Sequence, residues 1–61
     1  MPWYVVKLET ASGEVRIGIS QEPEGAEILA GPMDEELADT RSHALSAELH
    51  IPLFDNDVDR I

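Results

Sequence analysis

Residues of the types used in catalysis and metal binding lie close together between positions 39 and 50: Asp39, His43, Ser46 and His50. On a helix, the i, i+4 spacing would let Asp39 orient the His43 imidazole or share a divalent ion with it. His43 and His50 would lie two turns apart, about 10 Å, which is too far for one ion. Asp39, His43 and Ser46 are also the residue types of a nucleophilic triad, but a single helix face has no cleft that excludes water. We therefore expect surface histidines.

A second set of candidate ligands lies in the carboxyl-terminal segment. Asp55, Asp57 and Asp59 alternate as in the opening of a calcium-binding helix-loop-helix loop. That loop needs glycine at its sixth position, where this chain has Arg60, and a glutamate at its twelfth. The ligand set is incomplete, so a solvated acidic tail is expected.

No phosphate-binding loop is predicted either, because the glycines before the expected helix have no basic neighbour. A chain of 61 residues leaves little room for a concave active site. We expect no catalytic residues, no metal, no cofactor and no enzymatic activity.

A β-hairpin is the first element expected along the chain. Apolar residues alternate over Trp3–Thr10 and again over Val15–Ser20, with a short glycine-containing connection at 11–14. The alternation predicts one apolar face with Trp3 and Val5 on the reverse face. The predicted face consists of Tyr4, Val6, Leu8, Val15, Ile17 and Ile19.

A helix is expected after an acidic loop. A brief third strand over Glu27–Ala30 would end at Gly31-Pro32, and Pro32 would be the first residue of the helix. The helix would run from Met33 to about Leu49, with Asp34, Glu35 and Glu36 in its first turn. Its polar arc and its apolar side are predicted from a periodicity of 100° per residue. The polar arc is Glu35, Glu36, Asp39, Ser42, His43, Ser46 and His50, and the apolar side is Met33, Leu37, Ala38, Ala44, Leu45 and Leu49.

One alternative remains open at the end of this helix. Apolar and polar residues alternate strictly from Leu45 to Leu53, as in a strand. Under that interpretation the helix stops near Arg41 and a closing strand begins at His43. Alanine, leucine and glutamate are poor strand formers, which favours the long helix.

These elements predict one small α+β domain, with an N-terminal antiparallel hairpin packed on one helix. Its parts are a neutral hairpin (1–20), an acidic loop with a possible short strand (21–31), the helix (32–49) and an acidic tail (50–61). The chain has no cysteine, so neither disulfides nor thiolate metal sites supplement its small core. Association, either with a partner or in a homodimer, remains as a source of additional stability. The absence of cysteine also fits a reducing cytoplasm.

Charge is distributed very unevenly. The chain has 13 acidic and 4 basic residues, for a net charge of −9. Lys7 and Arg16 balance Glu9 and Glu14 in the hairpin, so the whole net charge belongs to residues 21–61. Such a chain is repelled by anionic lipid and by phosphate, which argues against membrane-surface and direct nucleic-acid binding. We also expect no membrane span and no secretory signal. The sign of the field favours a basic partner.

Small, cysteine-free and strongly acidic α+β chains of this kind resemble the DNA-mimic proteins of phages, including anti-CRISPR and anti-restriction inhibitors. Three acidic clusters carry the resemblance: Glu22–Glu27, Asp34–Asp39 and Asp55–Asp59. The resemblance implies that the chain occupies the DNA- or RNA-binding surface of an effector such as a CRISPR complex, in the host cytoplasm. The candidate partner-binding residues are Glu22, Glu24, Glu27, Asp34, Glu35, Glu36, Asp39, Asp55, Asp57 and Asp59. Trp3, the single tryptophan, is either an interface anchor or a cap on the core.

Two other interpretations of the same sequence remain. The chain could be a small homodimeric assembly or regulatory module that associates through the hairpin edge or through the face of Trp3 and Val5. Alternatively, its acidity could be the general solubility adaptation of a halophile, with no partner involved.

Overall fold

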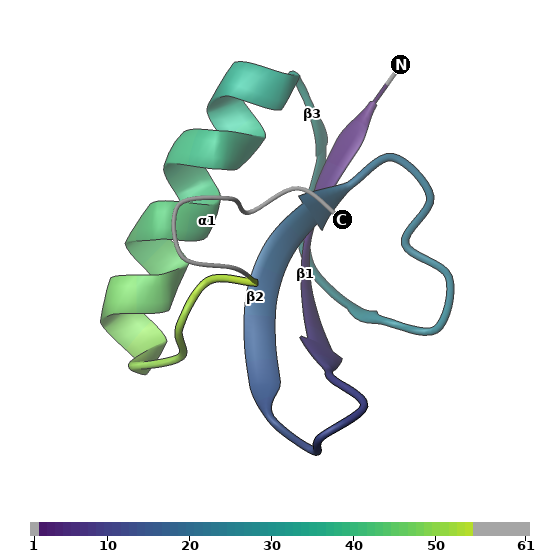
Figure 1. Ribbon diagram of the computed structural model, residues 1–61. Helices are drawn as coiled ribbons and strands as arrows, with labels where there is room; N and C mark the ends of the chain where they lie inside the picture. The colour runs from purple at the N-terminus through teal and green to yellow at the C-terminus, as the bar shows by residue number, and fades with distance from the viewer. Residues whose placement is uncertain (1, 55–61) are drawn as a thin grey trace.

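A computed structural model of the chain describes residues 2–54, which form a three-stranded antiparallel sheet packed against one helix (Figure 1). The strands are β1 (Trp3–Glu9), β2 (Val15–Ser20) and β3 (Glu27–Met33), and the helix is α1 (Glu35–Leu49). Strand order is β2-β1-β3, so β1 is the central strand. The predicted α+β class and the N-terminal hairpin are confirmed. Asp55, Asp57 and Asp59 lie outside the described residues.

The hairpin register differs from the one that the predicted apolar face requires. Val5 pairs with Ile19 and Lys7 with Ile17, so the apolar residues of β2 share a face with Val5 and not with Val6. The prediction was wrong because the ladder continues into the turn, where the Thr10 amide donates to the Glu14 carbonyl (2.7 Å). Three residues then close the turn, and a register change of one residue moves every side chain of a strand to the opposite face.

The core lies between the sheet and α1. Val5, Ile17, Ile19 and Ala38 are fully buried there. Seven partly buried residues pack against them: Trp3, Leu29, Ala30, Met33, Leu45, Ile51 and Leu53. Since complete burial of one Val or Ile side chain contributes about 1.5–3 kcal/mol, these few side chains supply much of the stability of so short a chain.

The helix contacts the sheet through small side chains. Ala38 and Ser42 are its buried residues, whereas Leu37 is 56% exposed and Leu49 is 44% exposed. The predicted faces of the helix were therefore wrong at Leu37, Ser42 and Leu49, whereas Ala38 is buried on the predicted apolar side. Small residues allow the helix backbone to approach the sheet, and the Ser42 hydroxyl stays satisfied by donating to the Asp39 carbonyl (2.8 Å).

Strand β3 is longer than expected and includes Pro32. Between Ala30 and Met33 it has two residues opposite Tyr4 alone, which makes a β-bulge, and Gly31 in that bulge has a φ of +119°. The peptide bond between Gly31 and Pro32 is cis. Proline is tolerated at edge strands and bulges, where no ladder hydrogen bond is lost. The prediction of Pro32 as the first helical residue was wrong, since α1 begins at Glu35 after Asp34 at the N-cap.

The end of α1 directs the chain back to the sheet. His50 is in the left-handed region (φ 58°), and the Ile51 amide donates to the Ser46 carbonyl (3.1 Å). Residues 52–54 then run parallel to β2: the Ile17 amide donates to the Pro52 carbonyl (3.0 Å) and the Phe54 amide to the Ile17 carbonyl (2.7 Å). The closing strand from His43 is wrong, because the helix continues to Leu49.

Candidate functional site

The predicted acidic residues fall into two separate groups on the described part of the chain. Glu22 and Glu24 belong to the β2–β3 connection, which lies over the face of the sheet opposite α1 (Figure 1). Asp34, Glu35 and Glu36 are exposed at the start of α1. Glu22 lies near Trp3, which pairs with Met33 at the end of β3, so both groups lie toward the same end of the sheet. The structure therefore presents two acidic surfaces, one on the loop over the face opposite α1 and one at the start of α1.

Two acidic residues are neutralised locally. Lys7 Nζ lies 3.8 Å from a Glu27 carboxylate oxygen, and Arg16 pairs with Glu14. Exposed pairs of this kind contribute at most about 1 kcal/mol to stability. Their main effect is on charge, since Glu27, one of the predicted partner-binding residues, has a cation of its own chain beside it.

The polar residues of the helix serve mainly the helix itself. His43 Nδ1 lies 2.7 Å from the Asp39 carbonyl oxygen and 3.6 Å from a carboxylate oxygen of the same residue. The Ser46 hydroxyl donates to the Ile51 carbonyl (2.5 Å) and thereby fixes the turn that ends α1. No group of three or more His, Asp or Glu side chains within residues 2–54 has the arrangement of a metal site.

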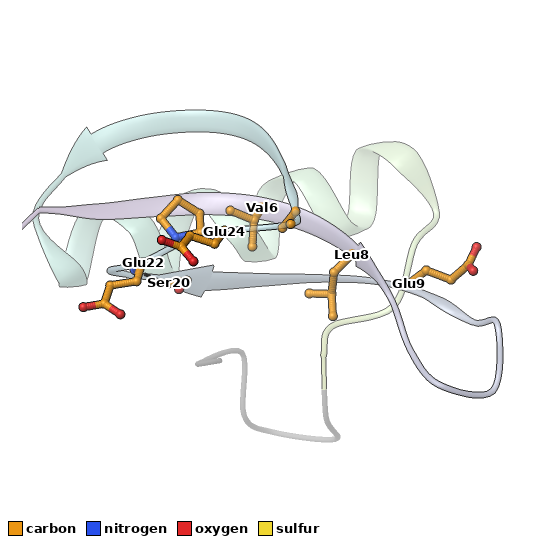
Figure 2. A pocket seen from close by; sticks show the side chains of 9 residues that line it. Val6, Leu8, Glu9, Ser20, Glu22 and Glu24 are labelled. Carbon is orange, nitrogen blue, oxygen red and sulfur yellow. Dashed lines mark hydrogen bonds between the residues drawn. The ribbon is translucent and has the colours of Figure 1, made fainter.

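A cavity of about 250 Å³ lies between β1 and the β2–β3 connection. Val6 and Leu8 are on the face of β1 opposite the core and form its apolar floor, with Pro23 and Ala26 beside them. Glu9, Glu22 and Glu24 are also among the lining residues. In Figure 2, Glu22 and Glu24 lie toward one end of the drawn residues and Glu9 lies at the other, with Val6 and Leu8 between them.

The loop over the cavity explains the burial of Val6, which the alternation of side chains along β1 does not predict. Val6 is fully buried although it points away from α1, because the loop of residues 21–26 covers it. Ser20 at the end of β2 is 6% exposed, and its hydroxyl accepts a hydrogen bond from the Glu22 amide (3.1 Å). This contact anchors the loop at the rim of the cavity.

Sequence reasoning did not find this cavity. It treated the hairpin as a scaffold and therefore left Glu9 out of the candidate residues. One signal was present: once Val5 and Ile19 face the core, Val6 and Leu8 form an apolar pair on the outer face that needs a cover.

Trp3 is half-buried and packs against the core cluster. Gln21 and Glu22 lie near it at the end of β2. The residue therefore contributes to the core, and its candidate role as an interface anchor stays a prediction.

Comparison with known proteins gives no assignment: no family model, no curated protein and no solved structure matches the chain. Within residues 2–54, α1 is neither long nor apolar enough to cross a membrane.

Proposed function

We propose that the chain is an acidic protein-binding inhibitor that mimics the charge of nucleic acid. Its target is the DNA- or RNA-binding surface of a basic effector, such as a CRISPR complex, in the cytoplasm of a host cell. The observation that carries the proposal is the exposure of Glu22, Glu24, Asp34, Glu35 and Glu36 on a small framework.

The magnitude of the charge supports the proposal. One strand of B-DNA carries a phosphate every 3.4 Å or so, and therefore about nine charges over 30 Å. The described residues extend 30 Å along their longest axis and carry 10 of the 13 acidic and 3 of the 4 basic residues, a net charge of −7. A groove that attracts one nucleic-acid strand would therefore meet a comparable total charge on this molecule.

The geometry adds a second argument. A flexible acidic chain would lose conformational entropy on binding, whereas carboxylates held on a helix start and on a hydrogen-bonded loop lose less. Glu35 and Glu36 are in the first turn of α1, and the loop that carries Glu22 is anchored by Ser20. The fold therefore already restricts these carboxylates, so less conformational entropy is lost when a partner binds.

Capture from a bacterial lysate treated with nuclease tests the proposal. The immobilised protein should retain a nucleic-acid-binding protein at 50 mM salt, release it at 500 mM, and release it to added duplex DNA or guide RNA. Retention that is equal at both salt concentrations, or that no nucleic acid displaces, would contradict the proposed function.

A self-associating module is the second candidate, and the open edge of β3 favours it. The other sheet edge is partly covered, because residues 52–54 bond to β2, but no described residue bonds to the outer edge of β3. Ile28 on this strand is 52% exposed. Pro32, which cannot donate, limits the usable edge, and the like charge of two copies opposes their approach. A melting temperature that rises with protein concentration would support this candidate.

A further inference from the structure

The cavity beside β1 combines an apolar floor with a carboxylate rim. Val6 and Leu8 alternate on one face of β1 and so lie about 6.6 Å apart along the strand. Glu22 and Glu24 lie toward one end of this floor in Figure 2. A ligand that matches both features needs an aliphatic segment and a positive charge in the same small group.

The walls of the cavity are held by bonds within the loop. The Glu22 amide donates to the Ser20 hydroxyl (3.1 Å) and the Ala26 amide to the Pro23 carbonyl (3.4 Å). Gly25 turns the chain with a φ of +77°. The cavity is therefore formed before any ligand enters, as in most small binding sites.

The charge of the rim is not cancelled by the basic residues of the hairpin. Arg16 is paired in register with Leu8 and so faces the same side of the sheet, but its guanidinium bonds to Glu14 in the turn. Lys7 points to the opposite face and contacts Glu27. Glu22 and Glu24 thus give this side of the molecule its net negative charge.

We propose that this cavity receives one lysine or arginine side chain of the basic partner. The volume of about 250 Å³ is below the 300–1,000 Å³ or so of sites for drug-sized ligands, which fits a single side chain. The aliphatic stem contacts Leu8 and Pro23, the half-buried apolar residues of the lining, and the cationic group reaches Glu22 and Glu24 at the rim. This inference rests on the proposed function in one respect, since it takes the partner to be basic.

The probe for the test is butylguanidinium, which has the stem and the charge of an arginine side chain. In a titration followed by amide NMR shifts, we expect saturable changes at residues 22–26 with a Kd of about 1 mM. Butylurea, which has the shape without the charge, and guanidinium, which has the charge without the stem, should each bind at least fivefold more weakly.

Paired variants assign the site. Glu22→Gln/Glu24→Gln should weaken butylguanidinium binding about tenfold, because two rim charges are removed at constant shape. Glu35→Gln/Glu36→Gln removes the same number of charges at the start of α1 and should leave the Kd unchanged. Equal loss in both variants would show general charge attraction and would overturn the proposal.

The comparison of probes does not depend on any variant. Equal binding of butylguanidinium and guanidinium, or shifts at residues 22–26 that do not saturate, would also overturn the proposal. The test uses no effector, so its outcome is independent of the capture experiment. If the cavity binds the probe but the protein captures no nucleic-acid-binding partner, the binding site for a cationic side chain is supported and the proposed mimicry of nucleic acid is contradicted.

Discussion

Gly31 is the position where the fold depends most sharply on one missing side chain. Its φ of +119° is in a region that L-residues rarely adopt. A Cβ atom there would lie 2.9 Å from the Trp3 carbonyl oxygen and 3.0 Å from Tyr4 Cα, both backbone atoms of the central strand. Gly31→Ala would therefore force β3 away from β1 at the bulge.

The expected cost has two parts. The unfavourable backbone conformation costs about 1–2 kcal/mol, and the overpacking costs about 1–3 kcal/mol. A domain of this length has a free energy of unfolding of only about 3–9 kcal/mol. Since 1 kcal/mol shifts the melting temperature of so small a domain by about 4–8 °C, Gly31→Ala should lower it by about 10 °C or more.

Thermal unfolding followed by circular dichroism measures the effect, and two other glycines serve as matched controls. Gly13 (φ +87°) and Gly25 (φ +77°) have no atom within 4 Å of the corresponding Cβ position. Alanine at either of them should cost only the conformational part, about 1–2 kcal/mol. If Gly31→Ala lowers the melting temperature no more than Gly25→Ala, the close packing of β3 on β1 is refuted.

Three further outcomes are expected. Ser46→Ala removes the hydrogen bond to the Ile51 carbonyl and should cost about 1 kcal/mol, with faster hydrogen exchange at the Phe54 amide; unchanged exchange there would contradict the role of Ser46 in placing residues 52–54. Ala38→Leu should cost about 1–3 kcal/mol in denaturant unfolding because Ala38 is fully buried between α1 and the sheet, whereas the control Ala44→Leu, at an exposed position, should stay within about 0.5 kcal/mol. In 10 mM salt, circular dichroism should show a folded protein that melts a few degrees lower than in 500 mM salt, because repulsion among its carboxylates is less screened; loss of the fold in 10 mM salt would favour the halophile interpretation.

The fold class was predictable because its signals are local. Alternation over β1 and β2 identified the hairpin, and acidic residues followed by good helix formers identified α1 up to Leu49. The sequence did not show which face of each element is buried. In the hairpin, the buried face depends on the length of the turn between Thr10 and Glu14, where one residue reverses it. In α1, it depends on the close fit of Ala38 and Ser42 against the sheet.

The candidate site was only partly predictable for a similar reason. The sequence shows which residues are acidic, but it does not show that the loop with Glu22 and Glu24 folds over Val6. Val6 and Glu22 are 16 positions apart in the sequence, and nothing in the local pattern of β1 or of the loop requires their contact. The extension of β3 through Pro32 likewise depends on its place at the sheet edge, which is a tertiary property.

The central claim is that carboxylates at fixed positions, and not total charge, direct the binding of a basic partner. Two variants with the same change in net charge test it: Glu36→Lys at the start of α1, and Glu48→Lys at an exposed position outside the two acidic surfaces. The Kd of the captured partner is measured for both and for the unmodified protein in 50 mM salt. We expect a Kd at least tenfold higher for the first variant and a change of less than about threefold for the second. Equal loss of affinity in the two variants would contradict it.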